Sequence, residues 1–206
     1  MIISDLIIRT GGRDRATGVA LFKSDGSFIC ELPKLLDNTP GSENESHRGR
    51  SYHTQSGLMA CGGAREGAAW NDDGTRGKTC VTFSEGKWIN SANTTYNRMG
   101  HSAWKTSKGV YLIGGSLGFA QGDRIIELVT ESGVQLQPFN LKYPHFAGCA
   151  IGLKDKVILT GGHGAVSKVA VYNEAGWIED LPNMNQYRWE HGCGHFINSD
   201  KKMVLN

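Results

Sequence analysis

The sequence has little net charge, little proline and no long apolar run, and each shortage excludes a class of protein. Lysine and arginine number 22 against 20 acidic residues, so the formal charge of +2 gives no electrostatic reason to expect a nucleic-acid partner. Five prolines in 206 residues argue against a collagen-like or a proline-rich disordered chain. No stretch approaches the roughly 20 apolar residues that span a bilayer, so we expect no membrane span.

The start of the chain also lacks the basic segment and the small-residue cleavage site of a secretion signal. We interpret Met1 to Gly12 as a strand that runs into a glycine turn. The cysteines are an odd set of five, so at least one is unpaired within the chain.

Glycine is abundant, at 28 of 206 residues, and it organises a repeat. Four apolar segments each end in a glycine pair, and the second glycines are spaced by 51, 52 and 47 residues. The pairs are Gly11-Gly12, Gly62-Gly63, Gly114-Gly115 and Gly161-Gly162. A period near 50 fits no helical repeat and matches one four-stranded blade of a β-propeller. We expect the glycines to let a strand turn where a Cβ would clash with neighbouring backbone.

Further strands can be placed within each period. A tight hairpin is expected after each glycine pair, flanked by Phe22 and Phe28, Phe83 and Trp88, Leu128 and Val134, or Tyr172 and Trp177. A short strand is expected before each of the last three pairs and near the C-terminus, at 51–55, 100–104, 148–153 and 192–197. The sequence therefore predicts an all-β chain.

These residues resemble the Kelch repeat, in which a strand ends in Gly-Gly and a Tyr-type residue and a Trp follow around a short hairpin. The best match carries Gly161-Gly162, Tyr172, Trp177 and Leu181-Pro182. The resemblance implies a Kelch-type β-propeller with six or seven blades. At this period such a ring needs about 300 residues or more.

The chain is accordingly expected to be one partial propeller region covering residues 1–206. Its expected parts are a partial unit 1–49, units 50–97, 98–144 and 145–187, and a truncated unit 188–206. A closed ring of four units is the alternative, with the strand at 192–197 completing the first unit. A fragment would expose unpaired strand edges, so we expect self-association through open blade edges.

Three Arg-x-x-His motifs recur near the expected first strands. They are Arg50 with His53, Arg98 with His101, and Arg188 with His191. One interpretation is a metal or ligand site at the mouth of the central channel. The favoured interpretation is that the motif joins blades by hydrogen bonds, because the third unit has Ala147 at that position. His145 and His195 lie nearby but off this register.

No motif for catalysis occurs, whether a nucleophile elbow, a phosphate-binding loop or a zinc-protease helix. Galactose oxidase has a Kelch-like propeller with a copper site, but no residue of this chain matches that site. We therefore expect no enzyme activity and no cofactor, with a metal-dependent oxidase-like propeller as the alternative.

Cys61 and Cys80 flank a long insertion on expected neighbouring strands, where they are either a disulfide or two small buried residues. Cys149 and Cys193 are interpreted as packing residues. Two glycosylation sequons occur, Asn44-Glu-Ser and Asn93-Thr-Thr, although composition alone accounts for one or two. These features favour secretion over the cytoplasm, which remains the alternative.

Two stretches, 37–50 and 64–78, are candidate binding loops on a propeller face. The second contains Trp70 among small and charged residues, either as an exposed aromatic anchor or packed on its own blade. The function predicted from the sequence is a non-catalytic scaffold that recognises a protein or a glycan.

Overall fold

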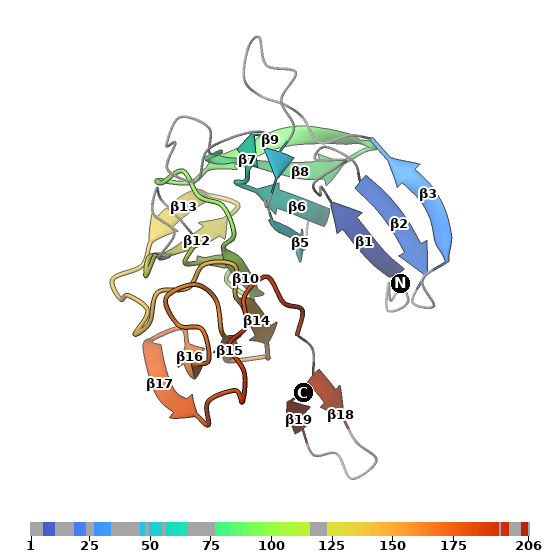
Figure 1. Cartoon of the computed structure of the whole chain (residues 1–206). Coiled ribbons are helices and arrows are strands. Elements are labelled where there is room, and N and C mark those ends of the chain that lie inside the picture. The colour runs from blue at the N-terminus through green and yellow to red at the C-terminus, as the bar shows by residue number, and fades with distance from the viewer. Residues whose placement is uncertain are drawn as a thin grey trace. The chain divides into compact units, whose positions relative to one another are not determined.

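The computed structural model describes residues 6–10, 19–23, 27–33, 46–47, 50–54, 57–65, 77–115, 123–193, 195–197 and 203–205. The chain divides into two compact units, Met1–Met99 and Gly100–Asn206. Every regular element in the described ranges is a β-strand (Figure 1). Since none of these residues is helical, the described part contains no helix able to cross a membrane.

The first unit contains a three-stranded and a four-stranded antiparallel sheet, in the orders β1-β2-β3 and β5-β6-β8-β9. A short antiparallel pair joins β4, which precedes β5, to β7, which lies between β6 and β8 in the chain. The strands are β1 Leu6–Thr10, β2 Val19–Lys23, β3 Phe28–Leu32, β4 Ser46–His47, β5 Arg50–Thr54, β6 Gly57–Cys61, β7 Ala64–Arg65, β8 Thr79–Ser84 and β9 Lys87–Asn93.

The second unit contains two four-stranded antiparallel sheets, β10-β11-β12-β13 and β14-β15-β16-β17, and the pair β18-β19. In each four-stranded sheet the strands follow one another in chain order. The strands are β10 Ser102–Lys105, β11 Val110–Ile113, β12 Ile126–Thr130, β13 Gly133–Leu136, β14 Cys149–Gly152, β15 Val157–Thr160, β16 Val169–Asn173, β17 Gly176–Leu181, β18 His195–Ile197 and β19 Met203–Leu205.

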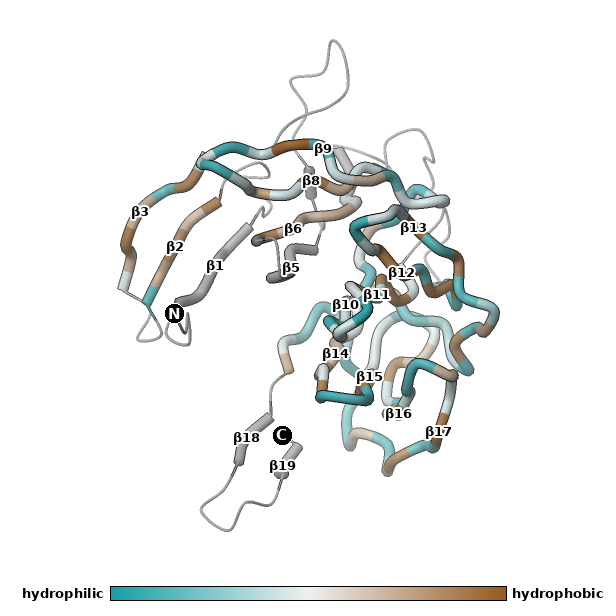
Figure 2. The backbone as a smooth tube through the Cα atoms, turned by 180° about the vertical axis from the view of Figure 1, so that it is seen from behind, coloured by the Kyte–Doolittle hydropathy of each residue, from teal (hydrophilic) through white to brown (hydrophobic). Residues whose placement is uncertain are grey.

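The burial of each strand explains its pattern of apolar and polar residues. The second strands β11 and β15 are buried along their whole length, so they appear in the sequence as uninterrupted apolar runs before the glycines. The last strand of the three- and four-stranded sheets (β3, β9, β13 or β17) is an edge and mixes hydrophilic with hydrophobic residues (Figure 2). In β17 four consecutive residues are exposed. The apolar segments that mark the repeat are therefore interior strands.

The hairpins fall where expected, with one shift in register. Phe83 pairs directly with Trp88, Tyr172 with Trp177 and Phe22 with Phe28. In the β12–β13 hairpin, however, Val129 and not Leu128 faces Val134, because only two residues separate the paired Thr130 and Gly133.

Consecutive sheets pack face to face within each unit. In the second unit one core joins β10–β13 to β14–β17, and Trp104 Nε1 donates a 3.0 Å hydrogen bond to the Leu153 carbonyl. In the first unit Val19 of β2 packs with Leu58, Ala60 and Trp88. There Trp88 Nε1 donates to the Pro33 carbonyl at 2.7 Å. The same kind of sheet-to-sheet contact is thus made in both units.

Candidate functional site

Each of the three glycine pairs in the described residues forms a hydrogen bond with the chain segment that follows its sheet. The amide of the second glycine donates to a carbonyl oxygen in that segment: Gly63 to Arg98 at 2.9 Å, Gly115 to His145 at 2.7 Å and Gly162 to Arg188 at 2.9 Å. The first glycine has a positive φ each time, 65° at Gly114 for example. A Cβ on Gly114 would overlap the His145 carbonyl. A side chain at Gly114 would therefore disturb this junction.

These hydrogen bonds give the true register of the repeat and correct one expectation. Residues 98, 145 and 188 are equivalent, so the residue aligned with His101 and His191 is Gly148 and not Ala147. Ala147 instead aligns with Gly100 and Glu190. All three have a positive φ, of 61°, 54° and 50° for Gly100, Ala147 and Glu190. The Ala147 amide donates to Gly100 O at 2.8 Å, and the Glu190 amide donates to Ala147 O.

His145, which the sequence placed off register, occupies the position of Arg98. Its ring lies over Gly148, with Cε1 and Nδ1 in the space that a side chain at 148 would fill. Its Nε2 is 2.8 Å from Ser102 Oγ, a buried contact between residues 43 apart in sequence. In this repeat the His145 ring therefore occupies the space of a side chain at position 148, and the absence of a Cβ at Gly148 makes that possible.

The described motif residues differ in exposure. Arg98 and His101 have no exposed surface, at 0% each. Arg188 is exposed, while His191 is half-buried with its Nε2 2.9 Å from Thr160 Oγ1. In the described ranges, no group of three or more His, Cys, Asp or Glu side chains is arranged to hold a metal ion.

Arg50 and His53 do not share the register of the other two motifs, which is a second correction. Arg50 pairs with Cys61 as Ser102 pairs with Ile113, so it lies four residues beyond the position of Arg98. The Arg-x-x-His spacing is thus coincidental at this repeat. Trp70 and its loop lie outside the described residues.

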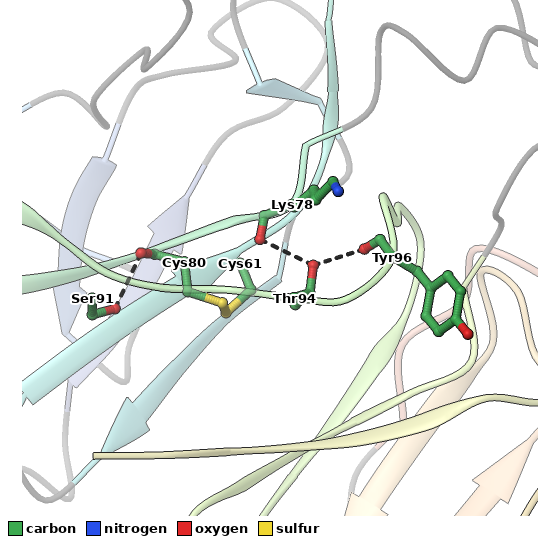
Figure 3. Close-up of a disulfide and its surroundings, with 6 residues drawn as sticks. All are labelled: Cys61, Lys78, Cys80, Ser91, Thr94 and Tyr96. Atoms are coloured by element: carbon green, nitrogen blue, oxygen red, sulfur yellow. Dashed lines mark hydrogen bonds between the residues drawn. A yellow bond between two sulfur atoms is a disulfide. The ribbon is translucent and has the colours of Figure 1, made fainter. Parts of the chain in front are cut away.

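Cys61 and Cys80 form a disulfide between directly paired residues of β6 and β8 (Figure 3). Both are buried, at 1% and 0% exposed. Beside them Thr94 Oγ1 lies 3.0 Å from the Lys78 carbonyl and 2.7 Å from the Tyr96 carbonyl, and Ser91 Oγ donates to the Cys80 carbonyl. This disulfide closes the insertion between the two strands.

Cys149 and Cys193 also form a disulfide, with their Cα atoms 6.0 Å apart, so their interpretation as packing residues was wrong. The bond joins β14 to the segment before β18. The similar positions of Cys149 and Cys193 in adjacent repeats could have predicted the disulfide. The segments that contain them lie side by side, since the Glu190 amide donates to the Ala147 carbonyl. Cys30 is the free cysteine. Two disulfides are typical of chains that fold in an oxidising environment.

Sequence reasoning missed an exposed aromatic pair in the segment after β17. Tyr187 is 78% exposed and Trp189 is 52% exposed, with Trp189 4.8 Å from the ring of His163. The residues equivalent to Trp189 in earlier repeats, Met99 and Phe146, are buried at 4% and 0%. Trp189 therefore differs from its equivalents in exposure, and the sheet that follows it, β18-β19, has two strands within the described residues.

A second exposed cluster ties the segment before β14 to the edge strand β17. Asp180 accepts hydrogen bonds from Lys142 Nζ at 2.6 Å, from Tyr143 Oη at 2.9 Å and from Trp177 Nε1 at 3.1 Å. Lys142 Nζ also lies 4.1 Å from the Trp177 ring centroid. The hydrogen bond from Lys142 lowers the pKa of Asp180, and the same bond raises the pKa of Lys142. The Asp180 oxygens are thus already occupied by protein donors.

Comparison with known proteins shows the fold and no family. No family model matches the sequence, and no curated protein matches it. Among the solved structures that match is one titled "Structure of YjhT", with a TM-score of 0.74 at 12% sequence identity. The match covers 94% of this chain and 67% of that one. At this identity the likeness concerns the all-β fold alone.

Proposed function

We propose that this chain is part of a Kelch-type β-propeller whose sheets are blades, and that it serves as a non-catalytic recognition module. The observation that carries the proposal is the repeated hydrogen bond from the second glycine to positions 98, 145 and 188. A contact repeated at equivalent positions, from each sheet to the chain segment that follows it, is what a stack of like repeats requires.

The burial and contacts of the repeat histidines favour a recognition function over a catalytic one. His101 has no exposed surface, His145 bonds Ser102 and His191 bonds Thr160. His145 and His191 join neighbouring segments and His101 is fully buried, so these imidazoles act as structural groups of the scaffold. Recognition then falls to residues of the connecting segments, which a rigid set of blades can hold in place.

Tyr187 and Trp189 are the described residues best suited to contact a partner. Their exposed fractions of 78% and 52% leave large aromatic surfaces in solvent, next to the exposed Arg188. Tyr, Trp and Arg are the residues that most often dominate binding energies at protein interfaces. The partner is a protein or a glycan outside the cell, and the two disulfides support that compartment.

The experiment is to probe arrays of glycans and of secreted proteins with the purified chain and its variants. Trp189→Ala should weaken binding to any selected target by about thirtyfold, the effect of a hot-spot residue worth about 2 kcal/mol. Trp177→Ala is the matched control, because Trp177 is exposed to a similar degree, 47%, on an edge strand.

Two results would contradict the proposal. One is equal loss of binding in Trp189→Ala and Trp177→Ala, which would place recognition elsewhere. The other is stoichiometric copper or iron that survives dialysis together with oxidation of an alcohol substrate, which would favour the oxidase-like alternative.

A further inference from the structure

Asn93 is the last residue of β9 and begins the sequence Asn93-Thr94-Thr95. Its main chain pairs with Thr79, and its side chain is exposed. β9 is the edge strand of its sheet, so no further strand of that sheet lies beyond it. The acceptor amide therefore stands at an open corner of the sheet, where a bulky group meets no other strand of that sheet.

The residue between the two sequon positions is held inward. Thr94 is 2% exposed, and its amide donates to the Lys78 carbonyl at 2.8 Å. Its hydroxyl lies 2.7 Å from the Tyr96 carbonyl. Asn93 and Thr95 on either side are both exposed. The local fold thus leaves the asparagine and the threonine hydroxyl position of the sequon on the outside.

The disulfides supply an independent observation about the compartment. Cys80 lies next to Thr79, the pairing partner of Asn93, and is bonded to Cys61 in the same sheet. Disulfides form where secreted proteins fold, and the transfer of glycans to Asn-x-Thr takes place on secreted chains. One sheet therefore carries both signatures of the secretory route.

We propose that Asn93 is N-glycosylated. The Asn93 Nδ2 atom loses a proton and forms a bond to the anomeric carbon of an oligosaccharide carried on a polyprenyl pyrophosphate. The bond from that carbon to the pyrophosphate oxygen breaks, and the polyprenyl pyrophosphate leaves with the electron pair. No oxidant or reductant takes part. The result is a solubilising glycan at the end of the β9 edge.

The experiment uses the full chain made in eukaryotic cells behind a cleavable secretion signal. Asn44→Gln serves as the background, because it removes the other sequon. The tryptic peptide 88–98 contains three asparagines, of which only Asn93 lies in a sequon. It should be recovered as a glycopeptide, and peptide-N-glycosidase should convert Asn93 to aspartate.

Three variants complete the test. Asn93→Gln removes the acceptor amide and Thr95→Ala removes the hydroxyl, so both should lose the glycan. Thr95→Ser keeps the hydroxyl and should retain it. Translation of the same variants with microsomes gives a second readout that does not depend on secretion. An unmodified 88–98 peptide in both systems, from chains with their disulfides formed, would overturn the proposal.

Discussion

The carbonyl oxygen of His145 accepts a 2.7 Å hydrogen bond from the amide of Gly115, across the junction between two consecutive sheets. The equivalent bond occurs at Gly63 and at Gly162. This junction depends on backbone atoms and on the small size of glycine, so it tolerates different side chains at positions 98, 145 and 188. Its strength can be tested by adding a single methyl group.

Gly114→Ala should destabilise the chain far more than Gly86→Ala. Both glycines have a positive φ, 65° and 79°, so both substitutions incur backbone strain of about 1–2 kcal/mol. A Cβ at 114 also overlaps the His145 carbonyl, whereas a Cβ at 86 meets nothing within 4 Å. We expect a loss of about 3 kcal/mol or more for Gly114→Ala, since the junction bond is displaced as well. Urea unfolding of the two variants measures the difference, and equal losses would mean that the junction is not tight.

Removing the Cys149–Cys193 disulfide should cost more than removing Cys61–Cys80. The sequence separations are 44 and 19, so chain entropy predicts losses of about 4 and about 3 kcal/mol respectively. The test is chemical denaturation of two double variants, Cys149→Ser with Cys193→Ser and Cys61→Ser with Cys80→Ser. Cys30→Ser is the control and should leave stability unchanged, because Cys30 is free. A larger loss of stability on removing Cys61–Cys80 would show that the entropy of loop closure does not decide the order.

Asp180→Asn should flatten the pH dependence of stability at both extremes. The pKa of Asp180 lies below its ordinary value of 3.8, so its contribution is present above that pH and is lost as pH falls through the lowered pKa. The pKa of Lys142 lies above 10.5, so its contribution is present below that pH and is lost as pH rises through the raised pKa. Melting temperatures of the wild type and Asp180→Asn between pH 2 and 12 check this. Identical profiles would show that the pair contributes nothing measurable.

Lysine on the open edges should reduce self-association without unfolding the chain. Ile89 in β9 is 43% exposed and Ile178 in β17 is 39% exposed, and both strands are sheet edges. Ile89→Lys and Ile178→Lys should lower the association measured by sedimentation velocity, since an edge lysine disfavours strand pairing. Stability should change by no more than about 0.5 kcal/mol, as at other surface positions. Ser107→Lys, in the exposed turn between β10 and β11, controls for added charge, and an equal reduction by that variant would refute an edge-specific effect.

The glycine spacing and the hairpin residues were enough to place the strands. Val110–Ile113 and Val157–Thr160 were expected as the strands before the glycines, and both are interior strands of four-stranded sheets. The candidate binding residues were harder to predict from the sequence. Trp189 matches core residues in earlier repeats and is nevertheless half exposed. Exposure depends on what covers a side chain, which the repeat pattern does not record.

The sequence by itself determined the all-β class, the period and the strand positions, because apolar alternation and turn residues act over a few neighbours. Only the tertiary structure decided the register of the motifs. It showed that Arg50 is not equivalent to Arg98 and that Gly148 is the position equivalent to His101. It also paired Cys149 with Cys193 in a disulfide. These relationships arise between strands and between sheets, where one residue of shift reverses which side chains meet. Such a shift leaves the local pattern almost unchanged, so contacts across the sheets alone can fix it.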